Sequence, residues 1–165
     1  MRTVNLKKPL VSRKKPLTDI SNCSTIADTI EYDVSQIGLI NKLFLDETFS
    51  EKNILMREIR SKISGYKQQD TEKGIFNANS IITMEQTVEK LVESRLKCLY
   101  CNCNMKLFYK NQREPTQWTL DRKNNNLDHS NENTVVSCLK CNLERRRRNM
   151  KDFKFSKQLA IVKNS

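Results

Sequence analysis

Apolar residues between positions 33 and 95 recur three or four positions apart, which is the spacing of an amphipathic helix. The pattern falls into three runs, at 33–45, at 51–64 and at 84–95. We therefore predict three packing helices over these runs. The apolar positions that support them are Val34, Ile37, Ile40, Phe44, Ile54, Leu55, Ile59, Ile63, Met84, Val88, Leu91 and Val92.

Local signals predict where two of these helices begin or end. Ser50 is a favourable N-cap for the second helix, and Gly65 is placed to end it. The polar stretch 65–70 then has the composition of a loop or of a helix-entry segment. Thr83 and Gln86 match a capping box, which predicts the start of the third helix.

Short apolar runs between polar turns replace the helical pattern in the last third of the chain. We predict one strand over 117–121, a second over 133–138 and a helix over 139–152. Trp118 either packs against this hairpin or stacks on a base. The chain is therefore expected to have an α+β fold, with helices first and a small hairpin-containing core after them.

Length and composition divide the chain into unequal parts. Its 165 residues are 37% hydrophobic and 30% charged, which indicates one domain with a modest core and an appended segment. We expect a disordered basic arm (1–30), a helical segment (31–96), a cysteine-containing domain (97–155) and a tail (156–165). The arm repeats Lys-Lys-Pro-Leu at 7–10 and 14–17. This repeat is typical of a nuclear-targeting or nucleic-acid-binding arm, and equally of a solvated tail.

Charge and hydropathy indicate the kind of partner. The chain has 30 Lys and Arg against 19 Asp and Glu, a net charge of +11, which favours a polyanionic partner and first of all nucleic acid. No apolar run approaches the roughly 20 residues that span a bilayer, and the N-terminus has no apolar signal region. We expect no membrane partner, and an intracellular location in a reducing compartment.

Paired cysteines are the clearest chemical signal. Cys98 and Cys101 form one C-x-x-C pair, and Cys138 and Cys141 form another. In a reducing compartment this spacing predicts a tetrahedral zinc site that stabilises a segment too polar to fold alone. Cys103 makes the first pair C-x-x-C-x-C, and it is either a spare thiol or a replacement for Cys101; we favour the spare thiol.

The residues around the second cysteine pair carry a resemblance to a known family. Trp118-Thr-Leu-Asp121-Arg122 with His129, followed by Asn133-Thr-Val-Val-Ser-Cys138-Leu-Lys-Cys141-Asn142, resembles the ββα-metal core of HNH endonucleases. The similarity is to the zinc-containing type, like phage recombination endonuclease VII. The stretch 65–142 also resembles an HNH-like group encoded by large DNA viruses of eukaryotes. The resemblance implies a treble-clef core and a DNA endonuclease acting in the nucleus or at a viral replication site.

The resemblance also implies roles for individual residues. Asp121 and Asn142 occupy the positions that hold one divalent ion in the family. Oxygen ligands of this kind suit Mg²⁺ or Mn²⁺, which must keep open positions for phosphate and water. The implied reaction is hydrolysis of a phosphodiester bond.

One position departs from the family pattern. The general base of the family is a histidine directly after the aspartate, and here that position is Arg122, which cannot accept a proton. His129 is the only imidazole in the chain. It is a candidate for the general base, for a metal or phosphate ligand, or for an ordinary loop residue. If His129 is not the base, Arg122 would hold a phosphate oxygen and turnover would be weak or absent.

A basic run follows the last cysteine. Arg145, Arg146, Arg147 and Arg148, with Lys151, are expected to contact nucleic-acid phosphates, and no base-reading pattern accompanies them. The leading interpretation is a divalent-metal-dependent DNA endonuclease. The alternative is a noncatalytic zinc-stabilised nucleic-acid-binding protein, and a third interpretation is a protein-interaction adaptor that docks through its helices.

Overall fold

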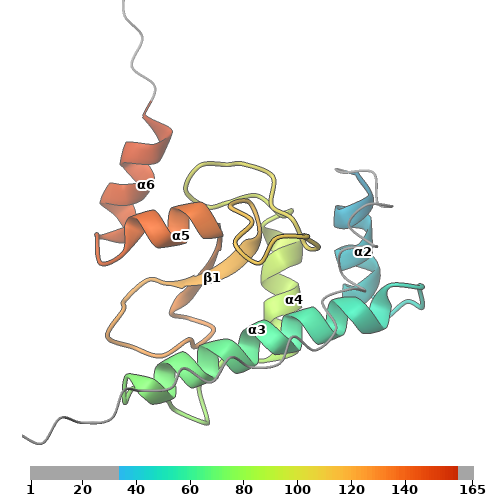
Figure 1. Cartoon of the computed structure of the whole chain (residues 1–165), viewed down its shortest axis with the longest axis horizontal. Coiled ribbons are helices and arrows are strands. Elements are labelled where there is room, and N and C mark those ends of the chain that lie inside the picture. The colour runs from blue at the N-terminus through green and yellow to red at the C-terminus, as the bar shows by residue number, and fades with distance from the viewer. Residues whose placement is uncertain (1–33, 160–165) are drawn as a thin grey trace, which may run out of the picture.

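The computed structural model describes residues 34–159, and this part has a mixed α+β fold (Figure 1). It contains five helices and one two-stranded sheet. The predicted basic arm over 1–30 and the last residues of the predicted tail lie outside the described residues. In chain order the elements are α2 (Val34–Phe44), α3 (Lys52–Glu72), α4 (Met84–Glu93), β1 (Trp118–Arg122), β2 (Thr134–Cys138), α5 (Leu139–Arg145) and α6 (Met150–Gln158).

The helical runs predicted from the apolar pattern are confirmed as α2, α3 and α4. Ile40, Leu55, Ile59 and Leu91 come from these three helices, and each is fully buried. Burying an aliphatic side chain of this size contributes about 1.5–3 kcal/mol to stability. The apolar face of each helix therefore holds the N-terminal half of the fold together, as the spacing indicates. No helix within residues 34–159 has the length and apolar character needed to cross a membrane.

Both predicted ends of α3 are wrong. Ser50 is not its N-cap, because the helix starts after Glu51 and no side chain caps it. Gly65 does not end the helix, which continues through the supposed loop to Glu72; the chain turns at Gly74, whose φ is +68°. A mid-helix glycine costs only about 1 kcal/mol relative to alanine, so tertiary contacts can outweigh it.

Those tertiary contacts join α3 to the backbone of β1. Lys62 donates to the carbonyl of Trp118 at 2.8 Å, and the backbone N–H of Leu120 donates to the hydroxyl of Tyr66 at 2.9 Å. Side chains of α3 thus satisfy polar backbone groups of β1, which would be costly to bury unpaired. The helix continues past Gly65 because its later turns complete this edge of the sheet.

The predicted capping box of α4 is confirmed. The N–H of Gln86 donates to the hydroxyl of Thr83 at 3.2 Å, and the N–H of Thr83 donates to the Gln86 side chain at 3.0 Å. The helix ends at Glu93, two residues before the predicted end. Arg95 and Leu96 follow with positive φ angles of 49° and 52°, and they turn the chain toward the cysteines.

The hairpin lies within one residue of its predicted strands. β1 and β2 are antiparallel, with Trp118 opposite Cys138 and Arg122 opposite Thr134. Every residue of β1 is buried, including Trp118, whose packing role is thereby confirmed. The buried residues of β1 include the polar Thr119, Asp121 and Arg122, which need partners inside the protein and are therefore candidates for a functional site.

The helix predicted over 139–152 is instead two helices. α5 ends at Arg145, and Arg146 has a φ of 52°, which an α-helix cannot contain. Asn149 then caps α6 by accepting from the N–H groups of Lys151 and Asp152. The chain turns between α5 and α6 (Figure 1). This break falls within the run of four consecutive arginines, so they cannot share one helical face.

Candidate functional site

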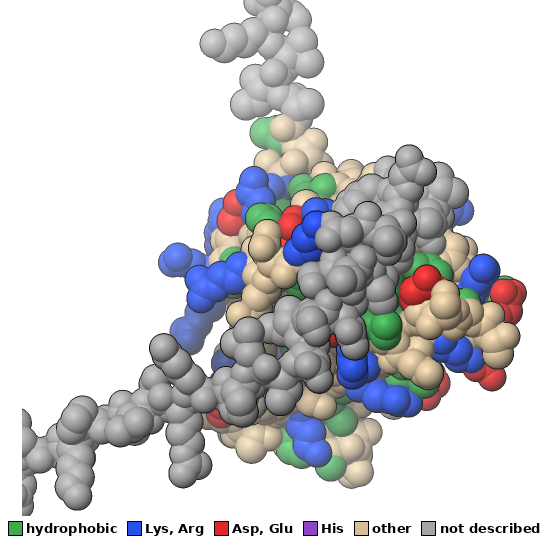
Figure 2. Space-filling view, turned by 45° about the vertical axis from the view of Figure 1, so that its right-hand side comes forward, with side chains coloured by type: hydrophobic (Ala, Val, Ile, Leu, Met, Phe, Trp, Pro, Cys, Tyr) green, Lys and Arg blue, Asp and Glu red, His purple; other side chains and the backbone are tan. Residues whose placement is uncertain are grey.

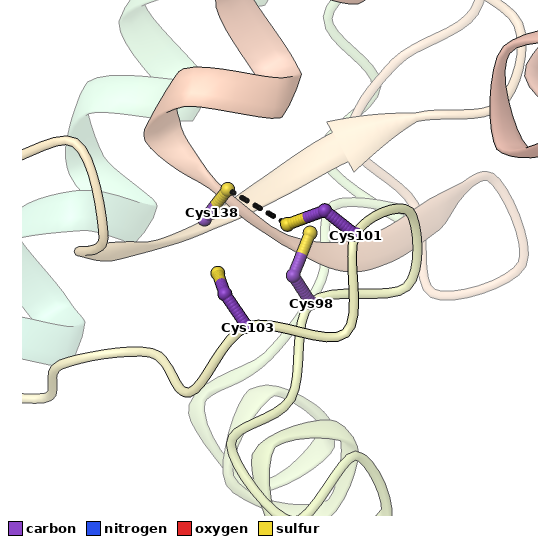
Figure 3. Close-up of side chains that lie close together, drawn as sticks. All are labelled: Cys98, Cys101, Cys103 and Cys138. Atoms are coloured by element: carbon purple, nitrogen blue, oxygen red, sulfur yellow. Dashed lines mark hydrogen bonds between the residues drawn. The ribbon is translucent and has the colours of Figure 1, made fainter. Parts of the chain in front are cut away.

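Four cysteine sulfurs converge between the loop after α4 and the end of β2 (Figure 3). The sulfur atoms of Cys98, Cys101, Cys103 and Cys138 all lie within 4.8 Å of one another. Tetrahedral zinc with Zn–S bonds of about 2.3 Å places its sulfurs about 3.8 Å apart. The sulfurs of Cys101 and Cys138 are 3.9 Å apart, so this cluster has the dimensions to hold a metal such as zinc.

The identity of the fourth thiol differs from the simplest reading of the two C-x-x-C pairs. Cys103, interpreted above as a spare thiol, belongs to the group of four, and Cys141 does not. Cys141 is nevertheless buried beside it, and its backbone N–H donates to the sulfur of Cys138 at 3.4 Å. Five thiols therefore surround this point, and the prediction of Cys141 as a zinc ligand stays a prediction.

The thiols are electrostatically unequal. A hydrogen bond with Cys138 lowers the pKa of Cys98 to about 4, against the opposing effect of burial. Burial raises the pKa of Cys103 to about 11 and that of Cys141 to about 12. Neighbouring thiols of the cluster therefore have pKa values shifted in opposite directions, so they conflict as ionised groups. A metal ion would remove this conflict by binding the deprotonated sulfurs.

A separate cavity of about 760 Å³ lies between α3, β1 and α5. We call it the arginine pocket. Its lining carries four cationic side chains and one carboxylate. Figure 2 shows one face of the molecule, on which Lys and Arg side chains project from the surface. The lining residues used below are Tyr66, Lys73, Thr119, Leu120, Asp121, Arg122, His129, Asn142, Leu143, Arg146 and Arg147.

His129 is held in the wall of the arginine pocket by Asp70. Its ring Nδ1 lies 2.8 Å from one carboxylate oxygen of Asp70, and its backbone N–H donates to the other at 2.7 Å. The ring also stacks on Tyr66, with the ring centroids 4.6 Å apart. These contacts fix the position of the ring, and the three interpretations of His129 stay predictions.

The remaining ring nitrogen of His129 has no hydrogen-bond partner within residues 34–159. Burial, together with the charges of Arg122 and Lys73, lowers the pKa of the imidazole below its ordinary value, although the carboxylate of Asp70 acts to raise it. The ring is therefore neutral at neutral pH. With Nδ1–H donating to Asp70, Nε2 carries a free lone pair and can accept a proton.

Asp70 also holds Arg122. The guanidinium Nη1 donates to the Asp70 carboxylate at 3.3 Å and to the carbonyl of Leu127 at 3.2 Å. Asp70 is completely buried, and its carboxylate connects His129 to Arg122. Sequence reasoning missed Asp70 and Tyr66 because it interpreted 65–70 as loop or helix entry; their spacing of four, one helical turn apart, was the available signal.

Asp121 and Asn142 both line the arginine pocket, as expected of neighbours. The Asn142 amide donates to the hydroxyl of Thr119 at 3.1 Å and to the carbonyl of Leu120 at 3.3 Å. The side chain of Asn142 therefore lies against the strand that carries Asp121. The two predicted ligands of a divalent ion do reach one cavity.

The carboxylate of Asp121, however, is already bound. One oxygen accepts from the Tyr100 hydroxyl at 2.5 Å and from Arg145 Nε at 2.6 Å, and the other accepts from Arg145 Nη2 at 2.8 Å. Burial and the neighbouring Asp121 raise the pKa of Tyr100, which therefore stays protonated as a donor. Neither Tyr100 nor this role of Arg145 was anticipated from the sequence.

The structure corrects the prediction that Arg145 contacts nucleic acid. Its side chain is 2% exposed, and beyond Asp121 it donates to the carbonyls of Arg122 and Arg148 and to the Asn125 side chain. It joins α5 to β1 and to the turn before α6. With five hydrogen bonds to groups inside the protein and almost no exposed surface, this guanidinium is not placed to contact a phosphate.

The other arginines of the run have separate positions. Arg146 and Arg147 are exposed and line the arginine pocket, where phosphate contact stays a prediction. Arg148 lies over the ring of Phe153, 4.6 Å from its centroid. Lys151 is exposed on α6 and does not line this pocket.

Known proteins add no assignment to this geometry. The site must be interpreted from its own contacts, burial and charge. No protein-family model, no curated protein and no solved structure matches the chain.

Proposed function

We propose that this protein is an endonuclease of the HNH type, with a zinc-stabilised treble-clef core, which hydrolyses phosphodiester bonds in DNA. The observation that carries the proposal is the hydrogen-bonded pair of His129 and Asp70 in the wall of a cationic pocket. Such a pair supplies a proton acceptor, and the surrounding cations attract the phosphate that the acceptor would act beside.

His129 acts as the general base in this proposal. Its neutral ring takes a proton on Nε2 from the attacking water, while Asp70 holds Nδ1–H and stabilises the imidazolium that forms. Asp70 is a positioning residue, because it acts through His129 and Arg122. In this proposal His129 replaces the family's histidine as the base, whose usual position is occupied here by Arg122.

The cations bind and orient the phosphodiester. Arg146, Arg147 and Lys73 line the pocket together with Arg122, which is paired with Asp70, and the one carboxylate of the lining, Asp121, is neutralised by Arg145. The pocket therefore has an uncompensated positive charge. Guanidinium groups suit phosphate because their N–H donors match two of its oxygens at once.

The divalent ion implied by the resemblance does not fit the donors as they lie. Asp121 accepts three hydrogen bonds from Tyr100 and Arg145, and the guanidinium of Arg145 stands where a cation would approach. Two positive charges would then compete for one carboxylate. We therefore assign no step of the reaction to Mg²⁺ or Mn²⁺.

Zinc has a structural role in this proposal. Cys98, Cys101 and Cys138 would hold it, with Cys103 or Cys141 as the fourth ligand. When bound, the ion stabilises the loop after α4 against the start of α5, since metal-binding energy becomes folding energy in a polar segment. The reaction itself uses none of these residues.

A noncatalytic nucleic-acid-binding protein is the second candidate. The pair of Asp121 with Arg145 favours it, because this pair occupies the carboxylate on which the family's chemistry depends. The cationic pocket would then bind the phosphate backbone without cleaving it. The two candidates share every feature except turnover.

Plasmid nicking separates the candidates. Zinc-loaded protein is incubated with supercoiled DNA, with and without added Mg²⁺ or Mn²⁺, beside His129→Gln, Asp70→Asn and Asn142→Ala. The endonuclease proposal expects nicking that His129→Gln abolishes while DNA binding and zinc content are retained. Asp70→Asn should lower the rate and shift its pH dependence. An exposed change outside the pocket, Lys42→Ala, serves as the control.

Three outcomes would count against parts of this proposal. Nicking by His129→Gln at the wild-type rate would remove His129 as the base. Binding without nicking in every sample, with either metal, would establish the second candidate. Nicking that requires Mg²⁺ and disappears in Asn142→Ala would show that the pocket does hold a catalytic ion.

A further inference from the structure

The guanidinium of Arg145 lies among oxygen atoms that come from three parts of the chain. Arg145 ends α5, which packs beside β1 (Figure 1). Its five hydrogen bonds all go to oxygens: both carboxylate oxygens of Asp121, the side chain of Asn125, and the carbonyls of Arg122 and Arg148. We call these five atoms the oxygen cluster. One buried cation therefore joins β1, the loop that follows it and the turn before α6.

The oxygen cluster contains the ligand types of a hard divalent cation. Calcium and magnesium ions in proteins are bound by carboxylates, backbone carbonyls and amide side chains, and all three are present here. The guanidinium Nη2 lies 2.8 Å from Asp121, 2.5 Å from the carbonyl of Arg122 and 3.2 Å from the side chain of Asn125. Calcium binds its oxygens at about 2.3–2.6 Å, so an ion at the position of Nη2 would require these oxygens to move by about 0.6 Å at most.

The arginine pocket gives an ion and its water ligands a route to the oxygen cluster. Asp121, Arg122 and Asn125 line this cavity of about 760 Å³, although the side chain of Asp121 is only 4% exposed. A small divalent ion keeps several waters when few protein ligands bind it. Cationic side chains of the same lining, such as Lys73, oppose the entry of an ion, so a site here would bind weakly.

In the wild-type protein the oxygen cluster already has a cation. Asp121 carries one negative charge and the guanidinium bound to it carries one positive charge, so this pair has no net charge to attract an ion. The side chain of Arg145 is 2% exposed, and its movement away from the cluster would leave buried oxygens without a donor. Because unpaired buried acceptors are costly, the guanidinium stays in place.

We propose that the guanidinium of Arg145 is the resident cation of a site that would otherwise bind a hard divalent ion. It neutralises Asp121 and joins three segments of the chain, as a bound structural ion would. The wild-type protein therefore needs no Mg²⁺, Mn²⁺ or Ca²⁺ at Asp121, and a variant without the guanidinium should acquire a site for such an ion. This role of Arg145 goes beyond the proposed function, because it does not require the pocket to bind or cleave DNA.

Binding of Mn²⁺ alone tests this role of Arg145. The full zinc-loaded chain is titrated with Mn²⁺, and the electron paramagnetic resonance signal of the free ion is measured in wild type, Asp121→Asn, Arg145→Ala and Arg145→Ala/Asp121→Asn. Wild type and Asp121→Asn should bind Mn²⁺ equally, because the carboxylate is not open to the ion. Arg145→Ala should bind one additional ion per chain, with a Kd of about 10⁻⁴–10⁻³ M as in weak calcium sites, and the double variant should lose it.

Urea unfolding keeps the test decisive if Arg145→Ala folds poorly. An ion that binds only the folded state stabilises it, so Mn²⁺ should raise the urea midpoint of Arg145→Ala more than that of the wild type. It should also restore the circular dichroism of any unfolded fraction. Arg146→Ala is the matched control, because it too removes a positive charge beside the pocket; it should gain no ion.

Three results would overturn this role of Arg145. Wild-type binding of Mn²⁺ that Asp121→Asn removes would show that the carboxylate accepts an ion beside the guanidinium. An additional ion that the double variant retains would place the new site elsewhere. If Arg145→Ala gains neither an ion nor Mn²⁺-dependent stability over Arg146→Ala, the oxygen cluster only accepts hydrogen bonds from arginine. Failure of the proposed function is measured separately, by the binding and nicking of DNA.

Discussion

The cysteine cluster and the network around Asp70 are built in opposite ways. Three of the four clustered thiols, Cys98, Cys101 and Cys103, lie within six consecutive residues, so a single loop brings them together. Asp70 meets His129 across 59 positions and Arg122 across 52, so only docking of α3 on the hairpin can join them. The spacing of nearby residues therefore brings most of the candidate metal centre together, whereas the candidate catalytic pair depends on tertiary packing.

The largest effect is expected from the cysteine cluster. Cys98→Ser removes a buried thiol that belongs to the group of four. Structural zinc contributes about 10–16 kcal/mol of apparent binding energy in small zinc domains, so its loss should unfold the segment that depends on it. Zinc content by mass spectrometry of the native protein, with circular dichroism, measures the effect. Retained zinc at one ion per chain would remove Cys98 from the ligand set.

A large effect is also expected from the ion pair that closes the site. Arg145→Met leaves the buried carboxylate of Asp121 without its charged partner, which typically costs about 3–5 kcal/mol. Urea unfolding gives the change in the free energy of unfolding. Arg146→Met, one residue away and exposed, is the matched control and should change stability very little. Equal effects of the two changes would show that the run of arginines acts as a unit.

Asp70→Asn should lower the free energy of unfolding by an intermediate amount, because it weakens the contacts with both His129 and Arg122. The amide can still accept a hydrogen bond, but it withdraws the charge that holds His129 and Arg122. A hydrogen bond to a charged group contributes about 1.5–3 kcal/mol, so we expect a loss of that order in urea unfolding. A double-mutant cycle with His129→Gln measures the coupling. Additive effects would mean that Asp70 and His129 do not interact.

Acidification should destabilise the protein through His129. Because burial lowers its pKa, the folded state resists the proton that the unfolded chain takes up near pH 6.5. The unfolded state then binds more protons, so stability falls as pH drops below about 6.5. We expect the free energy of unfolding, measured by urea unfolding, to fall between pH 7.5 and 5.5. His129→Gln removes the only histidine, and this pH dependence should disappear with it.

The smallest effect should come from a feature that the sequence shows directly. Thr83→Ala removes the side-chain cap of α4 and should cost about 1 kcal/mol. Thr71→Ala, whose hydroxyl bonds back to Lys67 within α3, is the control and should not reproduce this loss. A much larger cost at Thr83 would indicate that α4 supports the site more than its cap suggests.

The ends of the helices show where sequence reasoning stopped. Thr83 and Gln86 cap α4 as predicted, because both partners lie within one turn. Gly65 did not end α3, because Lys62 and Tyr66 bond to β1, more than fifty positions away. A local signal decides an element's boundary only where no distant contact competes with it.

The helical runs, the two strands and the two C-x-x-C pairs could be predicted from the amino-acid sequence, because each follows from spacings of two to four residues. Three other features depend on tertiary packing: the burial of Arg145 against Asp121, the contacts of Asp70 with His129 and Arg122, and the separation of the four arginines. The physical reason is that a charged side chain is buried only where another part of the chain satisfies it. Which residue becomes that partner depends on how the helices and strands pack, and a short stretch of sequence does not contain this information.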